Sequence, residues 1–248
     1  MVFFHAHPDD EAIFSGGTIA RLAAARHRVV VVMATSGDLG LNALDDSSSL
    51  AETRERELSD ACRILGVEEI VLMHYVDSGL DDAAFPPGSF ATADVDEAAR
   101  QLAAVLRAEN AMTLVVYDEG GIYGHPDHVQ VHRVGTAAAA LAGIATVYEM
   151  TVDREYLHFV DTHLIDHARE ALPHIEHIGM PTVFITTMLD VRDYLTQKRA
   201  AIAAHASQVY DTSSVMQLRP ESFSSVYGYE WYVRNGPPNI LETLVDEW

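Results

Sequence analysis

The sequence predicts an α/β protein with a Rossmann-like, doubly wound and mainly parallel sheet that carries helices on both faces. Three observations indicate this class: short apolar runs alternate with helical patterns, the connections are short, and polar clusters follow two of the apolar runs. We expect one domain over residues 1–248, because this length and the 48% hydrophobic content suit a single core. The regular core spans 2–150, and 151–248 is a less regular part that completes the domain.

Apolar periodicity predicts the elements of the core. Residues 2–4 form a short apolar run typical of a buried strand, and 11–26 follow as a helix. The β-branched run over 28–34 is typical of a parallel strand that is buried on both faces. The remaining core strands are predicted at 69–75, 113–117 and 145–150. Three further helices are predicted: one begins at Ser49, one begins at Asp94, and one covers 129–142.

Local signals mark the ends of these helices. Ser49 and Glu52 form the pattern of a capping box, and Gly66 marks the end of the same helix. Asp94 is the expected N-cap of the next helix. Pro126 suits the first turn of a helix, where a missing N–H costs nothing. Strand and helix therefore alternate as a parallel sheet requires.

Beyond residue 150 the alternation becomes weaker. We expect a strand at 182–187, a helix over 190–206 that Asp190 caps, and a final strand at 227–234. The proline-containing stretch 81–90 is predicted to be a loop that borders the functional site.

The charge and composition exclude several classes of partner. With 16 basic and 37 acidic residues, the net charge is −21, which disfavours nucleic acid and anionic membrane surfaces. No stretch approaches the roughly 18 apolar residues of a membrane span, and no signal peptide is expected before the first polar cluster. The single Cys62 is predicted to be a buried small hydrophobe and fits a reducing cytoplasm. The composition does not determine the oligomeric state, and a homo-oligomer is compatible with it.

Two polar clusters carry the chemistry of the chain. His5-Ala6-His7-Pro8-Asp9-Asp10-Glu11 follows the first predicted strand, and His125-Pro126-Asp127-His128 follows the strand at 113–117. Ligands of open α/β sheets bind beyond the carboxyl ends of the strands. Imidazoles and carboxylates there can supply the three ligands of a catalytic zinc site, with a base and an acid beside it. Asp9 or Asp10 could instead simply cap the helix that follows.

These motifs resemble the LmbE-like (PIG-L) family of zinc-dependent N-deacetylases. The strongest matches are His7-Pro8-Asp9-Asp10-Glu11 and Tyr123-Gly124-His125-Pro126-Asp127-His128. The resemblance covers about residues 2–208 and implies removal of acetyl groups from N-acetylglucosamine-containing molecules and related amides. Weaker matches follow in the family's order: Thr35-Ser36-Gly37-Asp38-x-Gly40, Arg54-x-x-Glu57-Leu58, Leu65-Gly66-Val67, Asp77-Ser78-Gly79 and Lys198-x-x-Ala201-x-x-x-His205-x-Ser207-Gln208.

The resemblance implies a metal centre and a base. His7, Asp10 and His128 correspond to the ligands of Zn²⁺, with Fe²⁺ as an alternative. Asp9 corresponds to the general base that takes a proton from a metal-activated water. A metal ion lowers the pKa of water from about 15.7 to about 7, so a carboxylate can complete this step.

Further roles are implied for residues around that centre. His125 corresponds to an acid or oxyanion-stabilising group, and Asp127 is expected to hold its imidazole and favour the charged form. Tyr123 corresponds to a tyrosine that polarises the substrate carbonyl. Arg54 and Asp77 match positions that bind sugar or inositol hydroxyls. The partner is thus a small N-acylated amino sugar.

Other interpretations use overlapping residues. Within the same family, the substrate could be that of a mycothiol-conjugate-type amidase or an antibiotic-intermediate deacetylase. His7, Asp9 and His128 could also form the triad of a non-haem iron oxygenase, although those enzymes are mostly β-sandwiches. A non-catalytic metal-binding protein is a third reading. His163 with His167, and His174 with His177, have helical ligand spacing but are expected to be exposed or capping residues. No role follows for Lys198, His205 and Gln208.

Overall fold

The computed structural model describes residues 1–40, 49–79, 85–163, 178–208 and 216–245. In these ranges one seven-stranded sheet has the order β3-β2-β1-β4-β5-β7-β6. Strands β1 to β5 pair in parallel, whereas β7 is antiparallel to both β5 and β6. The strands are β1 Val2–His5, β2 Val30–Thr35, β3 Glu69–Tyr75, β4 Thr113–Tyr117, β5 Thr146–Thr151, β6 Thr187–Asp190 and β7 Tyr229–Asn235.

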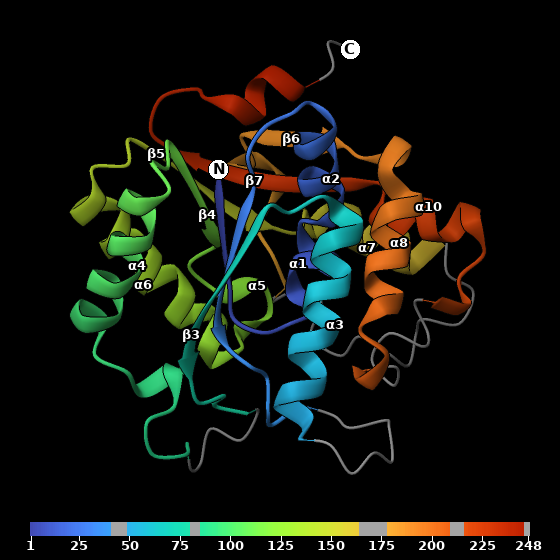
Figure 1. Cartoon of the computed structure of the whole chain (residues 1–248). Coiled ribbons are helices and arrows are strands. Elements are labelled where there is room, and N and C mark those ends of the chain that lie inside the picture. The colour runs from blue at the N-terminus through green and yellow to red at the C-terminus, as the bar shows by residue number, and fades with distance from the viewer. Residues whose placement is uncertain (41–48, 80–84, 164–177, 209–215, 246–248) are drawn as a thin grey trace.

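Helices cover both faces of this sheet, as predicted. Figure 1 shows α4 and α6 on one side and α1, α2, α3 and α8 on the other. In the described ranges the helices are α1 Asp10–Phe14, α2 Gly16–Ala24, α3 Leu50–Leu65, α4 Val95–Ala108, α5 Gly121–Gly124, α6 Pro126–Ala142, α7 Arg154–His163, α8 Leu195–Ala204 and α10 Pro220–Tyr227. Short 3₁₀ turns lie at η1 Phe90–Thr92, η4 Thr182–Phe184, η5 Arg192–Tyr194, η6 Ala206–Gln208 and η7 Ile240–Leu244.

The central strand β1 explains why the fold forms around the first residues of the chain. Phe3 pairs with Val31 of β2 on one side and with Val115 of β4 on the other. All four residues of β1 are buried, and so are all residues of β2 and β4. The predicted apolar runs are therefore the interior of a parallel sheet that is covered on both faces. Cys62 is buried in the same core, as expected.

The helix predicted over 11–26 is instead two helices that meet at Ser15. The Ser15 hydroxyl bonds to the Glu11 carbonyl oxygen (3.2 Å) and lies 3.1 Å from His5 Nε2. Gly17 permits a close approach after the break, because a Cβ there would lie 2.4 Å from Val191 Cβ. The Glu230 carboxylate then accepts hydrogen bonds from the Gly17 and Thr18 N–H groups (2.8 Å each), which satisfies the start of α2.

The structure confirms some of the predicted helix caps and contradicts one. The Asp94 carboxylate accepts a hydrogen bond from the Glu97 N–H, and Gly66 ends α3 in the left-handed conformation, both as predicted. The capping box predicted at Ser49 is wrong, because the Ser49 side chain makes no capping hydrogen bond. Pro126 is the first residue of α6, as predicted.

The carboxyl-terminal elements differ most from the prediction. Residues 182–184 form a 3₁₀ turn, and the strand begins only at Thr187. The helix predicted from Asp190 begins at Leu195, since Asp190 belongs to β6 and its carboxylate binds Arg192. The final strand at 229–235 is confirmed within two residues. His167, His174 and His177 lie outside the described residues.

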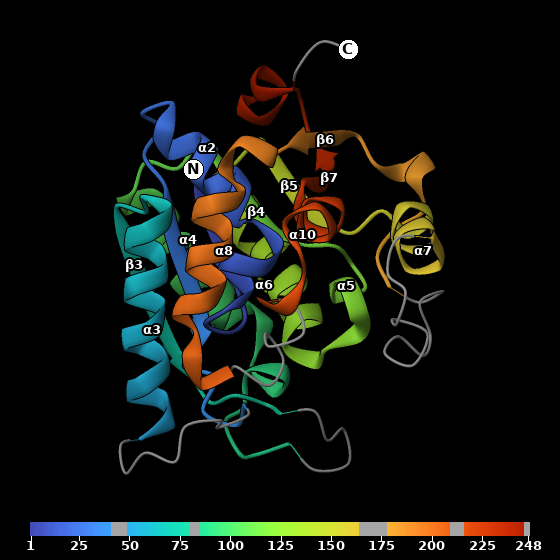
Figure 2. The same cartoon turned by 90° about the vertical axis from the view of Figure 1, so that its right-hand side faces the viewer.

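Figure 2 shows α7 at the edge of the molecule opposite α3, and α10 packs against both α7 and β7. None of the described helices is long and apolar enough to cross a membrane.

Candidate metal centre

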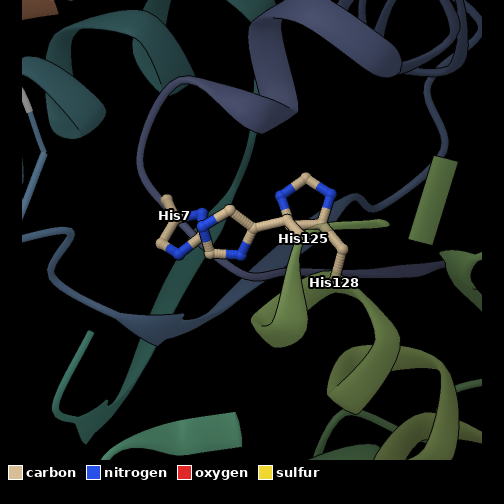
Figure 3. A group of neighbouring side chains, drawn as sticks. All are labelled: His7, His125 and His128. Carbon is tan, nitrogen blue, oxygen red and sulfur yellow. The ribbon is translucent and has the colours of Figure 1, made fainter. Parts of the chain in front are cut away.

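The two predicted clusters meet beyond the carboxyl ends of β1 and β4. His7 lies in the turn after β1, while His125 and His128 lie at the start of α6. One ring nitrogen from each of these three histidines lies within 4.8 Å of the other two. Figure 3 shows the three imidazoles gathered in one place, although His7 is more than a hundred residues away from the others in sequence. All three residues are buried.

Asp10 brings a carboxylate to two of these imidazoles. Its Oδ2 atom lies 3.4 Å from His7 Nδ1 and 3.3 Å from His128 Nε2. Ligand atoms around a tetrahedral ion, each about 2.0–2.1 Å from it, are separated by about 3.3 Å. Each distance alone is compatible with two ligands of one ion, but among the described residues neither group of three whose ligand atoms all lie within 4.8 Å of one another contains Asp10. The same Oδ2 accepts a hydrogen bond from the His7 N–H (2.9 Å), which fixes the turn.

The donor set offers more than one combination of ligands. His7, His125 and His128 form one group that could hold an ion, and His7, Asp77 and Asp127 form another. A cluster of imidazole nitrogens and carboxylate oxygens is the chemistry that zinc and ferrous iron prefer. The residues present thus fit a divalent metal ion of this kind.

Asp127 does not have its predicted partner. Its carboxylate lies 3.1 Å from His7 Nε2 and accepts hydrogen bonds from the Ser78 N–H (3.0 Å) and the Ser78 hydroxyl. Only the backbone N–H of Asp127 reaches His125, where it donates to Nδ1 (3.2 Å). The Asp127 carboxylate thus orients His7, as carboxylates often orient a metal-binding histidine.

The expectation of a charged His125 is also wrong. Burial lowers the pKa of His125 to about 4, and the neighbouring imidazoles of His7 and His128 add to this effect. A neutral ring is therefore favoured. Because Nδ1 accepts the Asp127 N–H, the proton of this neutral ring resides on Nε2.

Asp9 stands in an unusual backbone conformation beside the cluster. Its φ is +113°, which is uncommon for a residue other than glycine. Two contacts hold it there: the Asp9 N–H donates to Glu11 Oε2 (3.0 Å), and Asp9 Oδ2 lies 3.3 Å from an Arg54 nitrogen. Burial raises the pKa of Asp9 to about 7, with the Arg54 charge opposing and the Asp10 charge adding to the rise. Such a carboxylate can gain and lose a proton near neutrality.

The two predicted hydroxyl-binding residues are bonded to other groups of the site. Arg54 is 3% exposed, and its guanidinium donates to the carbonyl oxygens of Pro8 and Gly37. Asp77 is also 3% exposed; it accepts from the Gly79 N–H (2.9 Å) and lies 3.5 Å from His7 Nε2. Burial alone would raise the pKa of Asp77, but the contact with His7 holds it well below the usual value.

Tyr123 reaches the cluster from α5. Its hydroxyl lies 3.4 Å from His128 Nε2, and its side chain is half-exposed. The preceding Ile122 adopts a left-handed conformation, with φ of +66°, and this bend presents Tyr123 to the site. The predicted contact of Tyr123 with a substrate carbonyl stays a prediction.

Several supporting residues were not identified from the sequence. His205 Nε2 lies 2.7 Å from Glu11 Oε1, and both side chains are fully buried, so this pair anchors the turn that carries Asp9. Tyr117 stacks on His128 with ring centroids 4.1 Å apart, and its hydroxyl accepts the Ala6 N–H (3.2 Å). The family motif that contains His205 could have indicated a role for the His205–Glu11 pair. Nothing in the sequence distinguishes Tyr117 from the other residues of its strand.

Lys198 and Ser207, two other residues of the motif that contains His205, make contacts that hold the fold together. Ser207 donates through its N–H and its hydroxyl to the Glu57 carboxylate (2.7 and 2.6 Å), which joins η6 to α3. Lys198 pairs with Glu230 at 2.6 Å, and both side chains are at most 2% exposed. Through Glu230, which binds the first N–H groups of α2, this pair connects α8, β7 and α2.

Comparison with known proteins agrees with this geometry. The family model described as "PIG-L: GlcNAc-PI de-N-acetylase" matches residues 2–139. A 1D-myo-inositol 2-acetamido-2-deoxy-alpha-D-glucopyranoside deacetylase from Thermomonospora curvata is 35% identical, over 96% of this chain and 91% of that protein. The deacetylase activity predicted from the sequence agrees with the name of this relative.

Solved structures share the fold. The N,N'-diacetylchitobiose deacetylase from Pyrococcus horikoshii superposes with a TM-score of 0.63 at 21% identity, over 95% of this chain and 83% of that one. The A40926 pseudoaglycone deacetylase Dbv21 gives a TM-score of 0.65 at 13% identity, over 96% and 98% of the two chains. With the family match and the close relatives, these findings show that the chain belongs to the PIG-L (LmbE-like) family of de-N-acetylases.

Proposed function

We propose that this protein is a zinc-dependent hydrolase that removes the acetyl group from a 2-acetamido-2-deoxyglucose linked to an aglycone such as inositol. The observation that carries the proposal is the position of Asp10 Oδ2, 3.3–3.4 Å from nitrogens of both His7 and His128, with Asp9 next to it in the chain. The inositol-linked substrate named for the relative from Thermomonospora curvata supports the substrate class.

His7, Asp10 and His128 would hold the zinc ion, and His125 would stay outside the first coordination sphere. When bound, the ion would polarise the acetamide carbonyl and lower the pKa of the attacking water. Asp10 suits a ligand because its carboxylate contacts two imidazoles. Asp127 would keep the His7 ring in place through the contact at Nε2.

Asp9 would act as the base and then as the acid. With a pKa of about 7, its carboxylate accepts a proton from water as the carbonyl carbon is attacked. The same carboxyl group then delivers that proton to the sugar nitrogen as the C–N bond breaks, so acetate and a free amine are formed. Arg54 would restrain this carboxylate through the 3.3 Å contact at Oδ2.

His125 and Tyr123 would stabilise the negative charge that develops on the carbonyl oxygen. The neutral His125 ring donates from Nε2, because its Nδ1 already accepts the Asp127 N–H. The Tyr123 hydroxyl is a second donor close to His128. Two donors aimed at a developing oxyanion are a common and strong source of catalysis.

The iron oxygenase reading has less support. It requires the carboxylate of Asp9 together with His7 and His128, but the carboxylate that contacts both of these rings belongs to Asp10. Asp9 contacts Arg54 instead. The α/β fold also differs from the β-sandwich of most such enzymes.

Acetate release tests the proposal. Zinc-loaded protein should release one acetate from each molecule of inositol-linked 2-acetamido-2-deoxyglucose, and removal of the ion with a chelator should abolish the activity until zinc is restored. A protein that holds one equivalent of zinc and yet releases no acetate from any 2-acetamido sugar would contradict the proposal.

A further inference from the structure

A large apolar cavity lies next to the metal centre. Its volume is about 450 Å³, within the range of small-molecule sites. Residues of α1, α5, α7, α8, α10 and β7 line it, among them Phe14, Tyr123, Leu157, Val160 and Trp231. Nothing in the proposed deacetylation of an acetyl group requires a space of this size.

The lining of the cavity carries no net charge. The two charged residues in its lining, Lys198 and Glu230, pair with each other at 2.6 Å. The Lys198 ammonium group also lies 5.3 Å from the centre of the Tyr227 ring. Because this charge is neutralised within the protein, the cavity suits an apolar group rather than an anion.

Two aromatic rings join the cavity to the metal centre. Phe14 meets the His128 ring edge to face at 6.1 Å, and Tyr123 contacts the same ring at 4.9 Å between centroids. Phe14 and Tyr123 also stack on one another at 6.3 Å. Phe14 and Tyr123 therefore contact His128 and also line the cavity, so the cavity adjoins the metal centre.

The centre is polar on the side of β2 and β3, which lie on the other side of β1 and β4 from β5 and β7. We call Asp9, Asp38, Arg54 and Asp77 the polar wall; they come from the turn after β1, the ends of β2 and β3, and α3. Asp38 belongs to this wall because its carboxylate lies 3.5 Å from the Asp77 N–H. A substrate at the metal centre is thus flanked by hydrogen-bonding groups on one side and by apolar surface on the other.

We propose that the cavity binds the acyl chain of the substrate, so that the protein hydrolyses N-acyl glucosaminides with chains longer than acetyl in preference to the acetyl compound. This inference rests on the proposed function. The two substituents of a trans amide point in opposite directions. If the sugar hydroxyls face the polar wall, the acyl chain points towards Phe14 and Tyr123 and enters the cavity.

The size of the effect follows from apolar burial. Each methylene that leaves water for an apolar site contributes up to about a fourfold gain in binding. In the cavity this gain is made in both ground state and transition state. We therefore expect KM to fall with chain length while kcat changes little, until the chain fills the cavity.

A pair of isomeric substrates tests the direction of the chain. Methyl N-nonanoyl-glucosaminide and octyl N-acetyl-glucosaminide have the same composition but carry the alkyl chain at opposite ends. The zinc-loaded protein should hydrolyse the first at least tenfold faster than the second, measured as kcat/KM from amine release. Equal rates, or a preference for the octyl glycoside, would overturn this inference while leaving the proposed function intact. Hydrolysis of neither compound would overturn this inference, and it would overturn the proposed function as well only if the inositol-linked 2-acetamido-2-deoxyglucose also releases no acetate.

Variants that fill the cavity test its identity. Leu157→Trp and Ile178→Trp add bulk from two different segments of the lining. Each should lower the ratio of kcat/KM for the nonanoyl compound to kcat/KM for the acetyl compound by about tenfold. Leu141→Trp is the matched control, because Leu141 is 49% exposed on α6 and does not line the cavity. An unchanged ratio in both cavity variants, with Tm values near that of the parent protein, would contradict the inference.

Discussion

The polar wall and the apolar cavity flank the same metal centre but are built in different ways. Asp9, Asp38 and Asp77 of the polar wall come from short turns after parallel strands, and Arg54 comes from α3. Arg54 contacts Asp9, and Asp77 contacts His7 of the metal centre. The cavity comes from helices and strands distant in sequence, from Phe14 to Trp231. The residues proposed for catalysis therefore lie mostly at the carboxyl ends of parallel strands, whereas the cavity proposed for the acyl chain is lined by elements from α1 to β7.

The largest effect is expected from loss of a metal ligand. His7→Ala, Asp10→Ala or His128→Ala should each leave less than about a tenth of an equivalent of zinc after dialysis and no measurable acetate release, because three protein ligands are needed to retain the ion. His132→Ala is the control: it lies one helical turn beyond His128 and bonds to the Tyr117 carbonyl oxygen instead. Full zinc retention in all three ligand variants would refute the assigned centre.

The next largest effect distinguishes the proposed base, Asp9 of the polar wall, from the proposed ligands of the metal ion. Asp9→Asn should retain zinc and its Tm but lose about 10²–10⁴-fold in kcat, because an amide cannot accept the proton of water. Asp60→Asn, at an exposed site on α3, is a control that should behave like the parent protein. If Asp9→Asn loses its zinc, then Asp9 rather than Asp10 is the ligand.

A third effect follows from the pKa of Asp9. Burial raises this pKa to about 7, so the carboxylate is charged above that pH and protonated below it. Activity should therefore be retained at higher pH and fall about tenfold per pH unit below 7, to about one hundredth at pH 5. The measurement is kcat/KM of the zinc-loaded protein against pH.

Arg54 provides a check on the cause of this pH dependence. Its charge opposes the rise of the Asp9 pKa, so Arg54→Gln should move the acid limb to higher pH. A limb that stays in place in this variant would show that a group other than Asp9 controls the rate.

The comparison also explains which features could be predicted from the sequence. Most of the polar wall and the metal centre lie in short motifs that follow apolar runs, so the family and the fold class were predictable and are confirmed. The structure also brings His7 and His128 together, as these motifs predicted. A parallel sheet buried on both faces needs continuous apolar strands, and these are easy to detect.

The cavity and the secondary contacts of the site could not be predicted in this way. Asp127 was expected to hold His125, yet its carboxylate contacts His7 and accepts a hydrogen bond from Ser78, which follows β3 and comes close only through tertiary packing. The start of α2 after the break at Ser15 likewise depends on Glu230, more than two hundred residues later in the chain. Hydrophobic periodicity carries no information about such partners.

The smallest effect concerns Tyr123, which contacts the metal centre and also lines the cavity. Its hydroxyl lies 3.4 Å from His128 Nε2, while its ring lines the cavity and stacks on Phe14. Tyr123→Phe removes only the hydroxyl, so kcat should fall about tenfold, the value of one hydrogen bond to a developing charge. The preference for long acyl chains should stay the same, because the apolar ring remains. Tyr123→Ala should reduce both quantities, since the ring that joins the centre to the cavity is lost. A loss of chain-length preference in Tyr123→Phe itself would show that the hydroxyl, rather than the apolar surface, orients the acyl chain.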